Sequence, residues 1–213
     1  MTEIRALRRI LQIPRQLTSP WKQSGPLYVT LVKVDIQSFG DPARTQQHRE
    51  EMVTGLRTAL NEALSKTLRE VGERLRACKI EFQGDDALVL IPGRIASSVI
   101  LTYLPDNLAR ELRKYNATRC AEAQIKLRAA VHVGPVPDLV SCDAVILASH
   151  LVDAEALKAA LRDSKGSVLG MVASTKIYDE IIKQDPATNP TSFVEIPVEV
   201  KQTKTTGWMC LLS

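Results

Sequence analysis

Two short β-rich runs, about 50 residues apart, carry acidic residues that strand propensity would not place there. LYVTLVKVDIQSFG, residues 27–40, holds Asp35, and KIEFQGDDALVLIP, residues 79–92, holds Asp85 and Asp86. An unpaired carboxylate buried in an apolar strand costs several kcal/mol, so Asp35 indicates a site rather than a packing position. Asp85 and Asp86 allow a second interpretation, because Gly-Asp sequences also form turns. If the two runs are neighbouring strands, their carboxylates can hold a metal ion.

The hydrophobic pattern of the whole chain predicts an α+β fold. Strands are expected at residues 27–36, 78–82, 87–91, 126–136, 168–172, 193–200 and 208–212. Apolar residues at helical spacing predict helices at residues 43–75, 95–115, 145–162 and 175–183. We expect Pro105 to interrupt the second helix and Ser174 to cap the fourth. The order contains a ferredoxin-like βαββαβ core, followed by extra C-terminal strands and a helix.

The first 26 residues differ from the rest of the chain. Apolar residues fall at helical spacing in residues 1–13, and prolines, serines and a glycine follow in residues 14–26. This pattern predicts an N-terminal helix and linker over residues 1–26 and a single domain over residues 27–213. We expect the helix to pack on the domain or on a second copy of it; the alternative is a helix lying on a membrane surface.

Composition and charge argue against several classes of function. The net charge is +4 and no dense run of lysine and arginine is interleaved with aromatic residues, so we expect no nucleic-acid partner. The four cysteines form no CxxC motif, which argues against a zinc site and a disulfide framework. No apolar run approaches the ~20 residues of a membrane-spanning helix. We therefore expect a protein of the reducing cytoplasm without a membrane span.

Six segments of the chain resemble class III nucleotidyl cyclases and occur in the same order as in that family. They are VDIQSFG, EFQGDDALVL, LRAAVHVGPV, VILASHL, VASTKIYDEI and VEVKQTKTTGWMCLL, spread over residues 28–212. The sequence is most similar to the cyclase-homology domains of many actinobacterial proteins. The resemblance implies a signalling homodimer that binds a nucleoside triphosphate with two Mg²⁺ or Mn²⁺ ions and reports to an effector protein. In an active member the ribose hydroxyl attacks the α-phosphorus and pyrophosphate leaves.

The resemblance also implies roles for individual residues. Asp35 and Asp85 match the two metal-binding aspartates. Glu81 falls where cyclases place a base-reading residue, and Lys201 matches the lysine that binds the triphosphate. The loop whose backbone amides hold the phosphates corresponds to Ile36, Gln37, Ser38, Phe39 and Gly40. Glu81 and Lys201 each allow the plainer interpretation of a solvent-facing strand residue.

The part of the family pattern that performs the chemistry is altered. Active cyclases carry VNxAxR, in which the asparagine orients the ribose and the arginine stabilises the transition state; this sequence reads VILASH from Val145 to His150. Ile146 cannot form a side-chain hydrogen bond, and His150, the remaining catalytic candidate, replaces a permanently charged guanidinium poorly. Loss of such a donor typically lowers a rate by about a hundredfold or more. His132, in AVHVGPV, is expected to be structural.

Three interpretations of function stay open at this point. The first is an active cyclase, supported by Asp35, Asp85, Glu81 and Lys201. The second is a catalytically inactive cyclase-homology module that acts as a nucleotide sensor or a dimerising regulator, favoured by the altered VNxAxR segment. The third is a relative of GGDEF diguanylate cyclases or polymerase palms, since GDDALVLIP is similar to their signatures. Gln83 stands where those signatures have a glycine, and the C-terminal elements fit the cyclase better.

Overall fold

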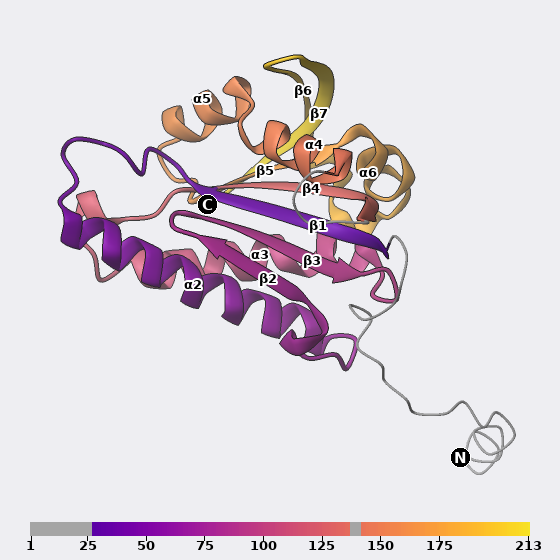
Figure 1. The fold of residues 1–213 in the computed structure, drawn as a ribbon, viewed down its shortest axis with the longest axis horizontal. Coiled ribbons are helices and arrows are strands. Elements are labelled where there is room, and N and C mark those ends of the chain that lie inside the picture. The colour runs from indigo at the N-terminus through magenta and orange to yellow at the C-terminus, as the bar shows by residue number, and fades with distance from the viewer. Residues whose placement is uncertain (1–26, 137–141) are drawn as a thin grey trace, which may run out of the picture.

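A seven-stranded sheet forms the centre of the computed structural model, which describes residues 27–136 and 142–213 (Figure 1). Its strands are β1 Leu27–Ile36, β2 Lys79–Gln83, β3 Asp86–Pro92, β4 Leu127–Val136, β5 Leu169–Ser174, β6 Val194–Val200 and β7 Thr203–Leu212. They lie in the order β2-β3-β1-β4-β5-β7-β6, and only β4 and β5 pair in parallel. The first four strands confirm the ferredoxin-like core, and the other three extend the sheet beyond β4. The N-terminal helix and linker predicted for residues 1–26 lie outside the described residues.

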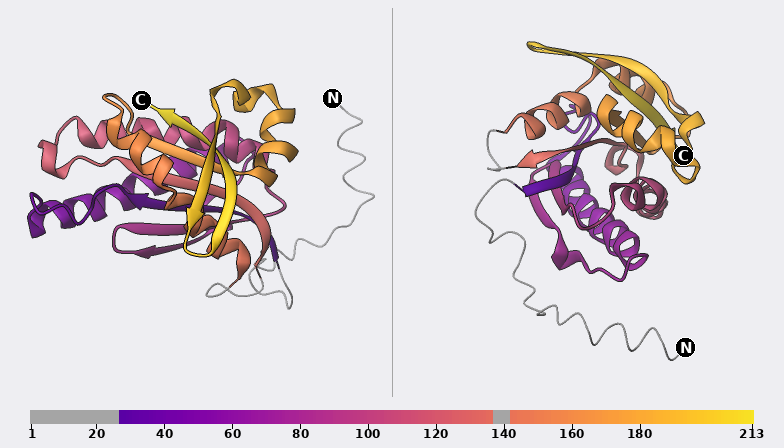
Figure 2. Two further views of the ribbon diagram at one scale, coloured as in Figure 1. Left: turned by 90° about the horizontal axis from the view of Figure 1, so that it is seen from above. Right: turned by 90° about the vertical axis from the view of Figure 1, so that its right-hand side faces the viewer.

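Helices cover the sheet on both faces (Figure 2). They are α2 Gln46–Arg69, α3 Ser97–Asn116, α4 Asp143–Val152, α5 Glu155–Asp163 and α6 Thr175–Glu180. The helices α2 and α3 pack on one face, whereas α4 and α5 pack on the other face over β4 and β5. None of the helices in the described part of the chain is long and apolar enough to cross a membrane.

The alternation of side chains along β1 divides the core from the candidate site. Val32, Val34 and Ile36 are at most 1% exposed and pack with the apolar stripe of α2 and α3. Successive side chains of a strand point to opposite faces, so Lys33 and Asp35 lie on the face away from those helices. The strand that builds the larger core therefore also carries the first acid of the candidate site.

Two expectations about helices are wrong. The predicted helix over residues 145–162 is two helices, because the chain turns out of helical geometry at Ala154, where ψ is 127°. The carbonyl of Val152, at the end of α4, accepts a hydrogen bond from the guanidinium of Arg128 instead. Pro105 does not interrupt α3: it is buried, and packing of the helix's apolar face offsets the lost hydrogen bond.

Other boundaries shift by a few residues. The first helix begins at Gln46 and ends at Arg69, before Gly72, whose φ of 71° is left-handed. The strand expected from residue 208 begins at Thr203, and residues 203–209 of β7 pair with the whole of β6. The predicted N-cap is confirmed, since the Ser174 hydroxyl accepts a hydrogen bond from the amide of Ile177.

His132 lies inside the domain and has a structural environment. Its Nδ1 lies 2.9 Å from the Oγ of Ser174, which links β4 to the start of α6. Burial, assisted by the charge of Lys176, lowers the pKa of His132 from 6.5 to about 4. The imidazole is therefore neutral at physiological pH.

Candidate functional site

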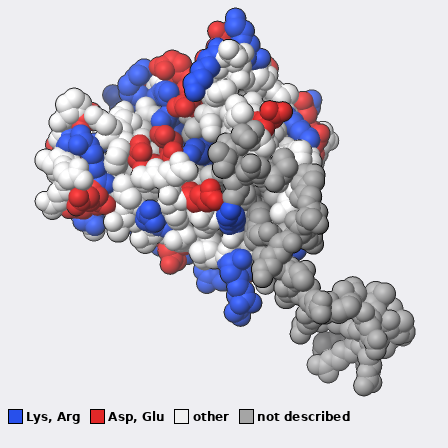
Figure 3. Space-filling model, in the orientation of Figure 1, with Lys and Arg blue, Asp and Glu red and all other residues white. Residues whose placement is uncertain are grey.

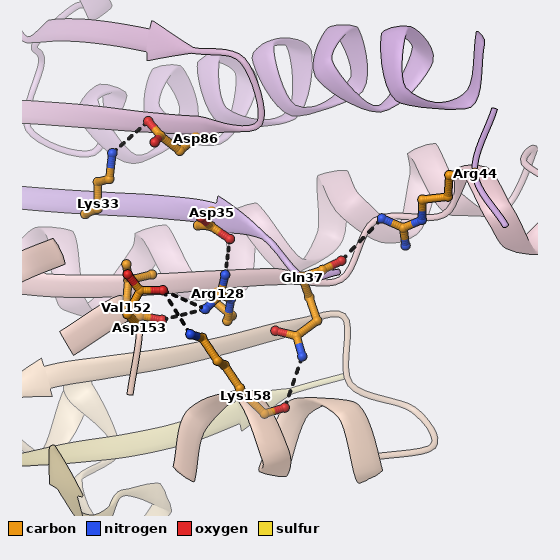
Figure 4. Close-up of polar contacts among 9 residues, drawn as sticks. All are labelled: Lys33, Asp35, Gln37, Arg44, Asp86, Arg128, Val152, Asp153 and Lys158. Atoms are coloured by element: carbon orange, nitrogen blue, oxygen red, sulfur yellow. Dashed lines mark hydrogen bonds and ion pairs between the residues drawn. The ribbon is translucent and has the colours of Figure 1, made fainter. Parts of the chain in front are cut away.

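The acids of the two β-rich runs come together at one end of β1 and β3. Asp35 on β1 stands opposite Asp86 on β3 in the antiparallel register. Lys33, two residues before Asp35, forms an ion pair of 2.7 Å with Asp86 (Figure 4). Directly opposed residues share a face of the sheet, so these three side chains lie together on the face away from α2 and α3. β1 and β3 are thus neighbouring strands that bring Asp35 and Asp86 together, and Asp85 precedes β3.

Asp85 belongs to the tight turn between β2 and β3, and that turn is fastened to β1. Gly84 has a φ of 65°, a conformation that suits glycine, and the carbonyl of Asp85 accepts the amide hydrogen of Ile36 at 3.1 Å. The negative charge of Asp85 contributes to raising the pKa of Asp35. Both interpretations of Asp85 are therefore compatible with its position: it is a turn residue, and its backbone carbonyl is bonded to the residue that follows Asp35.

Arg128 is a residue of this site that the sequence reasoning missed. It lies on β4 directly opposite Asp35 and is only 6% exposed, and its guanidinium forms an ion pair with the Asp35 carboxylate. The same guanidinium donates to the Val152 carbonyl at 3.0 Å and to Asp153 Oδ1 at 3.3 Å. A charged residue is rarely buried without a partner, so an arginine within the apolar run LRAAVHVGPV indicates a site in the same way as Asp35 does in its strand.

The pKa of Asp35 is raised, and burial is the main cause. The positive charge and hydrogen bond of Arg128 lower this pKa, while the negative charges of Asp85 and Asp153 raise it. The ion pair therefore offsets only part of the cost of burying the carboxylate. An additional cation beside Asp35 would favour the ionised form further.

The loop after β1 presents three consecutive backbone amides. Within the described residues, the amides of Ser38, Phe39 and Gly40 donate no hydrogen bond, whereas those of Ile36 and Gln37 are engaged with the carbonyls of Asp85 and Lys126. Ser38 has a φ of 54°, so the chain turns sharply here. Successive free amides in a turn form a concave anion-binding surface. Three of the five residues predicted for the phosphate loop offer free donors, and two do not.

The Gln37 side chain and Arg44 hold this loop in place. Gln37 is 8% exposed, and its Nε2 donates to the carbonyl of Lys158 on α5 at 3.1 Å. Arg44 donates to the Gln37 carbonyl at 3.3 Å (Figure 4). The loop is thus anchored at Gln37 by hydrogen bonds with α5 and with Arg44. Residues 38–40, at its tip, are exposed or partly exposed.

Glu81 lies on β2, on the same face of the sheet as Asp86. Its carboxylate forms an ion pair of 3.0 Å with Lys79, and its side chain is 35% exposed. Exposed pairs of this kind contribute little to stability, so Glu81 can exchange Lys79 for another partner at low cost. Its position is compatible with base recognition and equally with a plain surface role.

His150, Ile146 and Lys201 meet at a separate groove of about 670 Å³ between α4 and the β6–β7 turn. His150 Nδ1 is hydrogen-bonded to Thr203 Oγ1 at 2.7 Å, and Ile146 is 44% exposed. Lys201 occupies the turn with a φ of 54° and is exposed. Among the described residues that line this groove, Asp153 is the link to Arg128, and neither Asp35 nor Asp85 belongs to the lining.

The donor set at Asp35 and Asp85 fits a divalent ion that is shared with phosphate. Across the described residues, no group of three His, Cys, Asp or Glu side chains is arranged to hold a metal. One oxygen of Asp35 is paired with Arg128; its other oxygen and the Asp85 carboxylate accept no hydrogen bond from any described residue. Mg²⁺ often takes one or two carboxylates and completes its shell with phosphate and water. Asp35 and Asp85 could therefore supply part of the coordination shell of such an ion and would leave its remaining positions to other ligands.

Charges are interspersed over the face of the domain seen in Figure 3, where acidic and basic side chains alternate around the grey atoms. No single-sign patch dominates that face.

Comparisons with known proteins agree with this architecture. No protein-family model matches the chain, and no curated protein matches its sequence. The adenylate/guanylate cyclase/hydrolase from Silicibacter pomeroyi has a similar structure, with a TM-score of 0.58 and 13% identity over 88% of this chain and 98% of that chain. The guanylyl cyclase Cya2 gives a TM-score of 0.53 and 14% identity over 89% of this chain and 93% of that chain.

A third solved structure is the dimeric guanylyl cyclase domain of the RhoGC fusion protein from the aquatic fungus Blastocladiella emersonii. Its TM-score is 0.51, with 17% identity over 86% of this chain and 96% of that chain. At these identities the likeness concerns the fold, and it spans nearly the whole length of each cyclase domain. The chain therefore has the α+β fold of the class III nucleotidyl cyclase homology domain.

Proposed function

We propose that this protein binds a nucleoside triphosphate together with a divalent cation, Mg²⁺ or Mn²⁺, at the end of β1. The observation that carries the proposal is the run of three free amides at residues 38–40, next to Asp35 and to the turn that holds Asp85. Free amides bind phosphate oxygens, and a divalent ion between two carboxylates and the phosphates neutralises the remaining charge. The family's two-ion arrangement requires both acids, and without a metal ion Asp35 is paired with Arg128.

A homodimer would complete this site. The groove with His150 and Lys201 is lined by other residues than the acids and the phosphate loop, so one copy alone does not offer both halves in one cavity. In the dimer the groove of one copy would face the phosphate loop of the other, and Lys201 would add positive charge at the triphosphate. Glu81 would accept hydrogen bonds from a base edge after leaving Lys79.

The role we favour is that of a signalling module that senses the nucleotide in the cytoplasm and reports to an effector protein. Ile146 stands where the ribose-orienting amide is expected and has no donor, and His150 is held by Thr203. Both features weaken transition-state stabilisation while leaving the phosphate loop unaffected. Cyclisation to a cyclic mononucleotide is the alternative activity, and the same experiment tests it.

The test is calorimetric titration of the full chain with each of ATP, GTP, CTP and UTP, in Mg²⁺ and in Mn²⁺, followed by chromatography of the products. We expect saturable binding that weakens about tenfold or more in Asp85→Asn, because a charged ligand contact is lost. Asp163→Asn removes an exposed acid at the end of α5 and is the matched control, which should bind as the wild type does. Absence of binding for all four nucleotides would contradict the proposal, and a cyclic product would establish an enzyme.

A further inference from the structure

Arg128 holds two carboxylates that belong to different parts of the molecule. One is Asp35 on β1, and the other is Asp153 in the short break between α4 and α5 (Figure 4). Asp153 also lines the groove that contains His150 and Lys201. The guanidinium thus lies between the proposed metal ligand and the wall of the other half of the site.

The guanidinium of Arg128 is buried, yet not all of its N–H groups have a hydrogen-bond partner among the described residues. Its Nε is buried and has no hydrogen-bond partner among the described residues. Its Nη1 is shared between the Val152 carbonyl and Asp153, while only Nη2 contacts Asp35. Among the described residues, three of the five N–H donors of Arg128 have partners, so the guanidinium can re-form its contacts by a small rotation without leaving its pocket.

A divalent ion at Asp35 would compete with Arg128. Both are cations, and two like charges on one carboxylate repel strongly where burial lowers the effective dielectric. The only other carboxylate that contacts the Arg128 guanidinium among the described residues is that of Asp153, already 3.3 Å from Nη1. Asp153 is itself partly neutralised by Lys158 at 3.1 Å, which limits how strongly it attracts Arg128 in the metal-free protein.

From this geometry we infer that Arg128 is an exchangeable counter-ion of the metal site: it neutralises Asp35 in the metal-free protein and passes to Asp153 when a divalent ion arrives with the nucleotide. Arg128 is thus a positioning residue that sets the affinity for the metal and transmits its arrival to the α4–α5 break and the groove beside it. This inference rests on the proposed function, since it concerns the same site.

Four proteins form a double-mutant cycle that tests the exchange: the wild type, Arg128→Met, Asp153→Asn and the double variant. The probe is Mn²⁺, titrated in the presence of a non-hydrolysable ATP or GTP analogue and followed by electron paramagnetic resonance of the free ion. We expect Arg128→Met to bind Mn²⁺ more tightly, because a competitor is gone. Asp153→Asn should bind about three- to tenfold more weakly, because Arg128 then has no second carboxylate and stays on Asp35.

The double variant separates exchange from simple electrostatics. If Asp153 acts through Arg128, Asp153→Asn has no effect on Mn²⁺ affinity once residue 128 is methionine. If Asp153 acts only by its distant charge, its removal weakens binding by the same factor in both backgrounds, and the inference is overturned. An unchanged affinity in Asp153→Asn alone also overturns it.

Two controls keep the outcome decisive. If thermal unfolding shows that Arg128→Met does not fold, Arg128→Lys, which retains the charge, replaces it. The lysine variant should bind Mn²⁺ with an affinity between those expected for the wild type and for Arg128→Met. In that background Asp153→Asn should have a reduced effect. Lys33→Met removes a cation that pairs with Asp86 on the same face, and the effect of Asp153→Asn should be fully retained in that background. Absence of Mn²⁺ binding in every variant would overturn the proposed function as well, whereas binding without coupling overturns only the exchange.

Discussion

His150 on α4 is hydrogen-bonded to Thr203 at the start of β7, with 2.7 Å between Nδ1 and Oγ1. This hydrogen bond uses one of the two ring nitrogens and holds the imidazole in the groove against the uncharged hydroxyl of Thr203. A side chain held in this way offers at most one further hydrogen bond and no permanent charge. Among the described residues that line the groove, the cation is therefore Lys201 in the β6–β7 turn, and α4 contributes no guanidinium.

Restoring the missing donors should restore chemistry. In the double variant Ile146→Asn with His150→Arg, we expect the rate of cyclic mononucleotide formation to rise by about a hundredfold or more, because an oriented guanidinium stabilises developing charge. Product formation with the preferred nucleotide and Mn²⁺ is measured by chromatography. Asp163→Asn, an exposed acid at the end of α5 that does not line the groove, is the control and should leave the rate unchanged. A double variant that binds nucleotide without turning it over would show that other parts of the catalytic site are also missing.

The amide of Gly40 should contribute directly to nucleotide binding. Gly40→Pro removes this donor, and we expect the affinity for the triphosphate to fall about 10-fold to 100-fold, the usual value of a hydrogen bond to a charged group. Gly40→Ala is the matched control: a Cβ at this position meets no atom within 4 Å, and the amide is retained. Equal affinities of the two variants would indicate that the phosphates bind elsewhere. Thermal unfolding of both variants checks that the loop change leaves the domain intact.

Burial of neutral His132 should make the domain sensitive to acid. Its pKa of about 4 lies below the ordinary value of 6.5, so between these pH values the unfolded chain binds a proton that the folded chain does not. Stability contributed in this way is complete above pH 6.5 and is lost as the pH falls towards 4, by up to about 3 kcal/mol. Urea unfolding of the wild type and of His132→Gln at several pH values measures it. The difference in unfolding free energy between the two proteins should shrink as the pH falls; a constant difference would rule out this role.

Gly55 in the middle of α2 should resist a substitution that usually stabilises helices. Alanine in place of glycine normally adds up to about 1 kcal/mol to helix stability. Here a Cβ would lie 2.7 Å from Cδ2 of Tyr115 on α3, so the ring must move, and its hydroxyl would lose the hydrogen bond to the Ala123 carbonyl. We expect Gly55→Ala to destabilise the domain by about 1–3 kcal/mol in urea unfolding. In the Tyr115→Leu background the same change should be neutral or stabilising, and a stabilised Gly55→Ala single variant would contradict the packing.

The sequence predicted those parts of the fold that a local pattern of residues determines. Alternation and helical spacing located every strand and the sheet core, and an acid in an apolar strand pointed to Asp35. Arg128 is likewise a charged residue within an apolar strand, but the segment LRAAVHVGPV was interpreted only as a strand, so no role was predicted for its arginine. The pairing of these two residues depends on β1 and β4 being neighbours in register, which no local pattern contains.

The errors arose where tertiary contacts override local preference. Apolar spacing runs continuously from residue 145 to 162, yet the helix breaks where a buried guanidinium on another strand takes the Val152 carbonyl. In the loop expected to bind phosphates, the spacing likewise does not reveal that the amides of Ile36 and Gln37 donate to the carbonyls of Asp85 and Lys126. Such competition between partners is decided by distances in the folded chain, so it cannot be read from spacing.

The ten residues of β1 serve two purposes at once, since one set of side chains builds the core with α2 and α3 and the other set carries Lys33 and Asp35. Because the period of a strand is two, inserting or deleting one residue within β1 would exchange the two sets and bury the charges among leucines. The register of β1 thus determines both the packing of the core and the position of the candidate site. The candidate site can change in descendants of this chain by replacing residues, but it cannot move along the strand without loss of the fold.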